Sequence, residues 1–193
     1  MSTVVAIETP TGVAIAGDTR VVDGEAVSSD QFRRVFGLDG VGVGVVGESG
    51  AIQQFRRQFE VDLRDRGLRS GDAPDIDAVA RIAARETQEA GVDAVIGARD
   101  ADGAASLREV ASDGRVLEGG KIALGSGRKV ALGLLEALDA DEMTNDPAAA
   151  VRSVLETVTE RDVTTGGEVT VWVLGSADQI EQDVRRSGEE AER

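Results

Sequence analysis

Short apolar runs separated by turn residues dominate the first quarter of the chain. Such runs predict β-strands, and two runs joined by a tight turn predict a hairpin. Turn residues at 9–12, Asp23-Gly24 and Asp39-Gly40 separate the runs. The predicted strands cover residues 3–8, 13–16, 21–28, 34–38 and 41–46.

The pattern then changes to the spacing of amphipathic helices. Apolar side chains recur every three or four residues in two successive segments, which predicts two helices. A break at 67–73 separates them, Pro74 marks the start of the second, and Gly91 is expected to end it. The apolar positions are Ile52, Phe55, Phe59 and Leu63 in the first helix, and Ile76, Val79, Ala80 and Ala83 in the second.

Strands and helices follow once more in the second half. A helix is expected to run from Gly127 through Leu138, and Asp146-Pro147 is a typical start for the next one. Ser176 and Gln179 have the spacing of a capping box, which predicts a last helix that ends in an acidic tail. The predicted strands cover residues 92–98, 106–111, 122–124 and, as a buried strand, 169–174.

The order of these elements indicates the fold class. Strands, two helices, strands, two helices, a strand and a helix favour an α+β protein with sheets packed between helix layers, rather than alternating βαβ units. The length of 193 residues fits one domain over 1–193, with a frayed tail after about residue 187.

Composition removes several classes of chemistry. The chain has no Cys and no His, so disulfides, thiol nucleophiles, His-based acid–base pairs and almost all zinc sites are excluded. No cofactor and no metal are expected. Any catalysis must depend on Ser, Thr, Asp, Glu, Lys, Arg or the terminal amine.

The charge is strongly acidic, with 36 acidic and 21 basic residues and a net charge of −15. Such a surface repels phosphate, so a nucleic-acid partner is not expected. No apolar run reaches the roughly 20 residues that span a bilayer, and the first residues do not resemble a signal peptide. These features predict a cytoplasmic protein without a membrane partner.

Three stretches of the sequence form one pattern through their order and spacing. They are Ser2-Thr3-Val4-Val5-Ala6-Ile7 with Gly12-Val13-Ala14-Ile15-Ala16-Gly17-Asp18-Thr19-Arg20, Phe32-Arg33-Arg34-Val35-Phe36 with Val45-Val46-Gly47-Glu48-Ser49-Gly50, and Leu124-Gly125-Ser126-Gly127 with Arg161-Asp162-Val163-Thr164-Thr165-Gly166-Gly167. Together these stretches resemble proteasome β-type subunits of the N-terminal-nucleophile hydrolase family. The acidic, lysine-poor composition is in addition similar to that of salt-loving archaea.

The resemblance implies a four-layer αββα sandwich with two stacked antiparallel sheets. It also implies a peptidase in a ring of like or related subunits that acts on peptide or unfolded protein. In this family the first residue of the mature chain attacks the peptide carbonyl, and its own amine moves the proton. Asp18 and Arg34 follow Ser2 at the family's spacing for its aspartate and lysine, so the register selects Ser2 rather than Thr3 as the nucleophile after removal of Met1.

The remaining site residues are likewise implied by resemblance. Gly47 would supply the oxyanion N–H, and Ser126, Asp162 and Thr165 match the supporting hydroxyls and carboxylate, with Thr165 where Ser is usual. Arg34 departs from the family lysine. A guanidinium stays charged, so it can hold Asp18 bidentately but is poorly suited to relaying a proton.

Simpler interpretations remain open for the same residues. Ser2 can be an ordinary terminal residue, Asp18 a turn residue, Arg34 a plain ion-pair partner, Asp162 a solvated charge, and the glycines around Ser126 a tight strand–helix turn. Residues 42–47 spell the G-x-G-x-x-G string of dinucleotide sites, but they alternate with valines inside a predicted strand. The functional hypotheses are a peptidase with weak or lost activity, a catalytically silent ring-forming relative, and another amide hydrolase using the same nucleophile.

Overall fold

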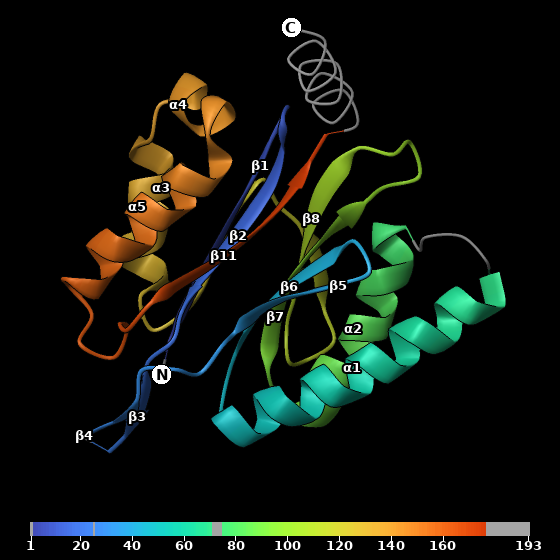
Figure 1. The fold of residues 1–193 in the computed structure, drawn as a ribbon, viewed down its shortest axis with the longest axis horizontal. Helices are drawn as coiled ribbons and strands as arrows, with labels where there is room; N and C mark the ends of the chain where they lie inside the picture. The colour runs from blue at the N-terminus through green and yellow to red at the C-terminus, as the bar shows by residue number, and fades with distance from the viewer. Residues whose placement is uncertain (1, 25, 71–74, 177–193) are drawn as a thin grey trace, which may run out of the picture.

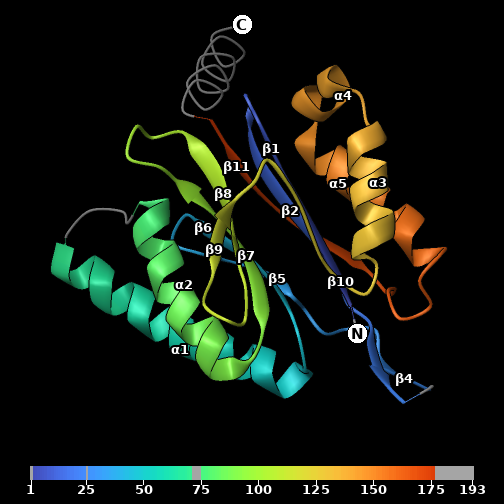
Figure 2. The ribbon, with the colours of Figure 1, turned by 180° about the vertical axis from the view of Figure 1, so that it is seen from behind.

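Two antiparallel sheets lie face to face between two layers of helices (Figures 1 and 2). The computed structural model describes residues 2–24, 26–70 and 75–176. The predicted α+β class with stacked antiparallel sheets is confirmed.

The first sheet has four strands in the order β10-β1-β2-β11. Its central hairpin pairs Val4 with Gly17 and Thr9 with Gly12, as the turn at 9–12 predicts. Strand β11 is added to the outer edge of β2 although it comes from the end of the described chain. The strands are β1 (Thr3–Thr9), β2 (Gly12–Asp18), β10 (Lys121–Gly125) and β11 (Val169–Gly175).

The second sheet has five strands in the order β5-β6-β7-β8-β9, each paired with its neighbour in sequence. Asp39 and Gly40 have positive φ angles of 48° and 82° in the tight turn of the first hairpin, as Asp-Gly predicts. The strands are β5 (Val35–Leu38), β6 (Val41–Val46), β7 (Asp93–Arg99), β8 (Ala105–Val110) and β9 (Val116–Glu118). A separate small hairpin is formed by β3 (Val21–Asp23) and β4 (Ala26–Ser29).

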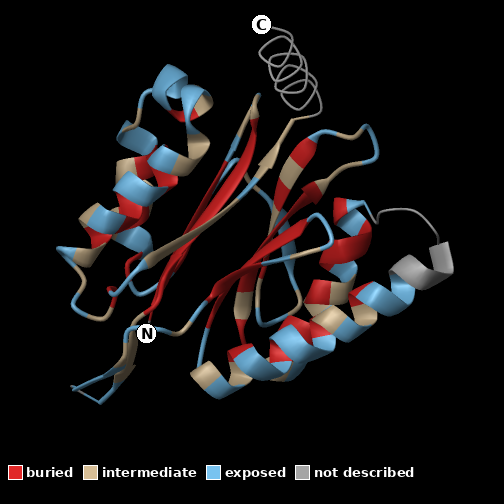
Figure 3. Ribbon diagram, viewed as in Figure 1, coloured by how far each residue is buried: buried red, intermediate tan, exposed pale blue. Residues whose placement is uncertain are grey.

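Helices cover the outer face of each sheet and bury their apolar stripes there (Figure 3). Phe55 and Phe59 stack with ring centroids 5.4 Å apart in the layer that covers the five-stranded sheet. That layer consists of α1 (Ser49–Ser70) and α2 (Ile76–Ala90). The layer on the four-stranded sheet consists of α3 (Arg128–Ala137), α4 (Ala140–Asn145) and α5 (Pro147–Thr159).

The space between the sheets is filled mainly by small and β-branched side chains together with Trp172. A Cβ on Gly42 would overlap the six-membered ring of this indole, and one on Gly97 would lie 2.9 Å from it. A Cβ on Gly44 would lie 2.6 Å from Val4 and 2.9 Å from Ile15 of the opposite sheet. The two glycines of the 42–47 string that lie in β6 therefore leave room for side chains of the opposite sheet, and packing explains them without a dinucleotide.

Several predictions from the sequence need correction. Helix α1 continues through Gly67 to Ser70, because the apolar contacts made by its earlier turns support a longer helix than local propensity suggests. Strand β11 is half-buried rather than buried, because it forms the edge of its sheet and leaves Val173 47% exposed. Strand β9 and helix α4 were not predicted. Pro74 and the capping-box helix after Ser176 lie outside the described residues.

Candidate active site

A cleft of about 410 Å³ opens at the end of the sandwich where β1 begins. It brings together three residues that the sequence predicts for the site, Ser2, Gly47 and Ser126. Its other lining residues are Val46, Glu48, Gly91, Asp93 and Gly125.

Ser2 is held at the cleft by its backbone. Its carbonyl accepts a hydrogen bond from the Ser126 N–H at 3.0 Å, and the Ser126 hydroxyl oxygen lies 3.4 Å from the same carbonyl. Gly125, with φ at 90°, passes so close to the Ser2 carbonyl that a Cβ at this position would overlap it. The Gly125-Ser126 turn thus fixes Ser2 by contacts that no larger residue at 125 permits.

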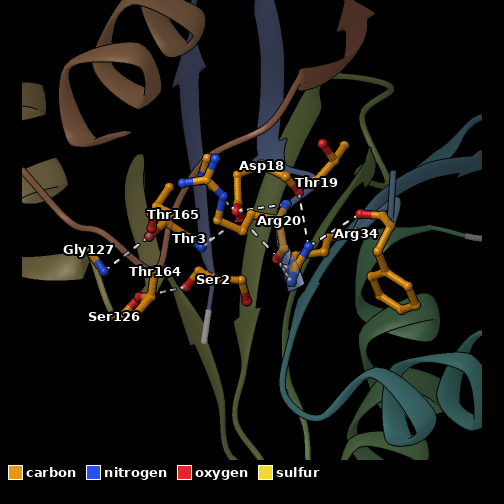
Figure 4. Close-up of polar contacts among 12 residues, drawn as sticks. Ser2, Thr3, Asp18, Thr19, Arg20, Arg34, Ser126, Gly127, Thr164 and Thr165 are labelled. Atoms are coloured by element: carbon orange, nitrogen blue, oxygen red, sulfur yellow. Dashed lines mark hydrogen bonds and ion pairs between the residues drawn. The ribbon is translucent and has the colours of Figure 1, made fainter. Parts of the chain in front are cut away.

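Thr3 points away from Ser2 into a closed polar environment (Figure 4). It is fully buried, and its hydroxyl lies 2.6 Å from the Thr165 hydroxyl. The same oxygen accepts the Gly127 N–H at 3.0 Å, and the Thr3 N–H donates to Asp18 at 3.0 Å. The Thr3 hydroxyl is therefore occupied on two sides by groups of the protein itself.

Asp18 ends β2 as a fully buried carboxylate. One of its oxygens accepts the Thr3 N–H, and the other accepts the N–H groups of Arg20 at 3.2 Å and Gly166 at 3.0 Å. Burial raises the pKa of Asp18, and the charge of Arg34 and these backbone donors oppose that rise. Through these hydrogen bonds Asp18, at the end of β2, connects that strand to β1 and to the loop before β11.

Arg34 does not form the expected bidentate pair with Asp18. Only its Nε approaches the carboxylate, at 3.9 Å, and this Nε has no hydrogen-bond partner among the described residues. The terminal nitrogens instead donate to the carbonyls of Asp18, Phe32 and Arg20. The reason is geometric, because the fork reaches past the carboxylate to the chain segments that precede and follow the β3–β4 hairpin.

The charge of Arg34 is balanced inside the protein. Burial lowers the pKa of Arg34 and the negative charge of Asp18 opposes this effect. The guanidinium also lies 5.3 Å from the centre of the Phe32 ring. Within the described part of the chain no hydrogen bond joins Arg34 to Ser2, so its observed contacts are those of an ion-pair partner and backbone clamp.

Asp162 and its hydroxyl partners form the other side of the site. The carboxylate accepts the hydroxyls of Ser126 at 2.6 Å and of Thr164 and Thr165 at 2.8 Å each, and also the Thr164 N–H at 3.0 Å. Partial burial opposes ionisation, but these donors together hold the pKa of Asp162 below its usual value. The sequence prediction missed the contacts of Thr164 and Thr3 in this network. Those of Thr3 could have been predicted from strand alternation, because successive side chains of a strand point to opposite faces and residue 3 therefore points away from the face of residue 2.

Gly47 follows β6 and lines the cleft opposite the Ser126 turn. Its φ of 154° favours glycine, and a Cβ would lie 2.8 Å from Val92. A larger residue would therefore be strained here, both by the backbone conformation and by the side chain of Val92.

Other features limit the chemistry of the described residues. Among them, no group of three or more carboxylate side chains is arranged to hold a metal ion. No helix in the described ranges is both long and apolar enough to cross a membrane.

Comparison with known proteins places this geometry in a family. The sequence profile of the family described as "Proteasome subunit" matches residues 1–174. Similar proteins include "Proteasome subunit beta 2" of Thermofilum pendens, 28% identical over 93% of this chain and 91% of that protein. "Proteasome subunit beta" of Natronomonas pharaonis is 31% identical over 92% of this chain and 76% of that protein. "Proteasome subunit beta" of Haloferax volcanii is 26% identical over 90% and 73%. A profile that covers most of the chain and relatives that match it nearly end to end show that this protein belongs to the proteasome subunit family.

Proposed function

We propose that this chain is a β-type proteasome subunit with Ser2 as its N-terminal nucleophile and with weak or lost peptidase activity. The carrying observation is the placement of Ser2 at a cleft beside Gly47 and Ser126, while the neighbouring Thr3 hydroxyl is used internally. Removal of Met1 would give Ser2 the free amine that the chemistry requires.

The proposed reaction is acyl transfer to the serine oxygen. The Ser2 hydroxyl adds to the substrate carbonyl while its proton passes to the Ser2 amine, and the N–H of Gly47 stabilises the oxyanion. The amine then returns the proton to the departing substrate nitrogen, which leaves an ester on Ser2. Water hydrolyses this ester and releases the acid.

Arg34 is the reason to expect a slow reaction. A lysine at this position could approach the nucleophile and could itself gain or lose a proton there. The buried guanidinium of Arg34 instead stays charged and donates to three backbone carbonyls. Asp18, Ser126, Asp162 and Thr165 support the geometry in this proposal. Arg34 keeps the electrostatic balance of the site but takes no part in proton transfer.

The setting of the activity follows from the family and the composition. We expect a cytoplasmic protein that assembles into rings with copies of itself or with other proteasome subunits, and that acts on peptides or unfolded protein. The net charge of −15 favours assembly in concentrated salt, which screens repulsion between acidic subunits. Light scattering that gave only a monomer in molar salt would contradict the ring.

A catalytically silent subunit is the second candidate, favoured by the same commitment of Arg34 to the backbone. A third possibility is cleavage of another amide by the same nucleophile. Both candidates share the scaffold of the first. The silent subunit would hydrolyse no substrate, and the other hydrolase would cleave an amide that is not a peptide bond.

Intact mass combined with activity tests the proposal. We expect a mass without Met1, and slow hydrolysis of fluorogenic peptides in high salt that Ser2→Ala abolishes. Ser153→Ala, an exposed serine on α5, is the matched control and should retain the activity. Retained Met1 would exclude Ser2 as an N-terminal nucleophile, and hydrolysis that survives Ser2→Ala would place the activity elsewhere.

A further inference from the structure

Among the residues that the structure describes, Thr3 alone contacts the hydrogen-bond networks of both Asp18 and Asp162. Its N–H donates to Asp18, and its hydroxyl contacts the Thr165 hydroxyl (Figure 4). The Thr165 hydroxyl in turn donates to Asp162. Thr3 lies in β1 directly after Ser2, so whatever fixes Thr3 also fixes the main chain that carries Ser2.

The direction of each hydrogen bond around Thr3 follows from counting protons. An ionised Asp162 can only accept hydrogen bonds, so the Thr165 hydroxyl donates its single proton to this carboxylate. In the 2.6 Å contact between the two threonines the proton is therefore that of Thr3. The oxygen of Thr3 accepts the N–H of Gly127, so the chain runs from Gly127 through Thr3 and Thr165 to Asp162.

A second path returns from Asp162 to Ser2. The Ser126 hydroxyl donates to Asp162, and the Ser126 N–H donates to the carbonyl of Ser2. Both paths end on Asp162, and the peptide bond between residues 2 and 3 connects their other ends. Within the Thr3 chain the hydrogen bonds run in one direction from Gly127 to Asp162, so they polarise and strengthen each other.

We infer that Thr3 is a positioning residue whose hydroxyl holds Ser2 at the cleft by linking Asp162 to the Gly127 turn. The inference rests on the proposed function only in taking Ser2 as the nucleophile. The role belongs to the hydroxyl, because the N–H of any residue at position 3 could donate to Asp18.

The test compares Thr3→Val, which removes the hydroxyl at nearly constant volume, with Thr3→Ser, which keeps it. Thr157→Val on α5 is the control, since its hydroxyl bonds only the carbonyl of Ser153 in its own helix. The readouts are residue-resolved amide hydrogen exchange at Ser126 and Gly127, and affinity for a peptide boronate, which forms a tetrahedral adduct with a serine oxygen.

Thr3→Val removes the acceptor of the Gly127 N–H directly, so faster exchange at Gly127 is expected in any case. The informative amide is that of Ser126, which donates to the carbonyl of Ser2 and forms no hydrogen bond with the Thr3 side chain in the described structure. Loss of about one hydrogen bond corresponds to roughly tenfold faster exchange at Ser126 and roughly tenfold weaker boronate binding. Thr3→Ser should stay within about threefold of the native protein on both readouts, and Thr157→Val should match the native protein.

Each outcome decides one question. Unchanged exchange at Ser126 in Thr3→Val would overturn the inference, and so would a folded Thr3→Ser that fails to restore protection, because the methyl group would then matter rather than the hydroxyl. Native protein that binds no boronate, with the exchange pattern as expected, would reject Ser2 as nucleophile and leave the positioning role of Thr3 intact. If Thr3→Val does not fold, Thr165→Val interrupts the same chain without altering β1, and exchange at Ser126 must then rise.

Discussion

The two carboxylates of the site have opposite environments. Asp18 is fully buried, accepts only backbone N–H groups and lies near the buried cation of Arg34. Asp162 is partly exposed and accepts mainly side-chain hydroxyls. Burial raises the pKa of Asp18, whereas the hydroxyl donors lower that of Asp162.

This difference separates a rigid side of the site from an adaptable one. Backbone donors are fixed by the sheet and cannot follow a change of charge, so Asp18 acts as part of the scaffold. Hydroxyls can rotate and can either donate or accept, so the Asp162 side can adjust to a change of charge in a way that the Asp18 side cannot. Thr3 is the residue that connects the two.

The largest expected effect comes from breaking the rigid side. Asp18→Ala leaves the Arg34 charge buried without compensation, and we expect a loss of about 4 kcal/mol in the free energy of unfolding. Denaturant titration measures this loss. A loss below about 1 kcal/mol would mean that Arg34 moves to solvent in the variant. The Asp18–Arg34 pair would then not be what holds the two ends of the β3–β4 hairpin.

Breaking the adaptable side should cost less and depend on pH. We expect Asp162→Asn to lower the free energy of unfolding by about 2 kcal/mol near neutral pH, because hydrogen bonds to a charged acceptor are lost. The folded-state pKa of Asp162 lies below the ordinary value of 3.8, so its stabilisation is complete above that pH and disappears as the pH falls through the folded-state value.

Stability measured against pH for Asp162→Asn and the native protein checks this dependence. The difference between the two should shrink on acidification. Asp23→Asn, an exposed change in β3, is the control and should follow the native protein throughout. A difference that stays constant through this range would show that the carboxylate is not held ionised by its hydroxyl partners.

A change at Arg34 should alter chemistry more than stability. Arg34→Lys keeps the charge but cannot reach three carbonyls and the carboxylate with the same planar geometry, so we expect a loss of about 1 kcal/mol in stability. The ammonium can change its protonation state near Ser2, so hydrolysis of fluorogenic peptides should increase. Arg33→Lys, at the exposed neighbouring position, should change neither quantity.

The smallest effect is expected where an ion pair is open to solvent. Arg20 and Asp30 pair at 2.9 Å with side chains 27% and 45% exposed. Asp30→Ala should therefore cost about 0.5 kcal/mol or less and lose its effect in molar salt. Thermal unfolding of Asp30→Ala and the native protein at low and high salt measures this difference in stability. A large loss of stability that persists in molar salt would show that the pair supports the fold as the buried Asp18 does.

Much of the fold followed from local patterns. The strand pairs around 9–12 and Asp39-Gly40 lie where alternating apolar runs and turn residues predict them, and Asp146 caps α5 as its position before Pro147 suggests. The errors fall where local preference and tertiary packing disagree. Gly67 favours a helix end, but α1 continues to Ser70, and β11 reads as a buried strand although its edge position leaves it half-exposed.

What the sequence determined by itself is its match to the family motif. By that resemblance it marks Ser2 rather than Thr3 as the expected nucleophile and Asp18, Arg34, Ser126, Asp162 and Thr165 as the expected supporting set, because a motif match depends only on residue types and their order along the chain. The tertiary structure decided what each of these residues contacts. The fork of Arg34 turns to three carbonyls, and the Thr3 hydroxyl meets a residue 162 positions away. Such contacts require elements remote in sequence to be placed relative to one another to within a few tenths of an ångström. Only the packing of the sheets and helices fixes these positions.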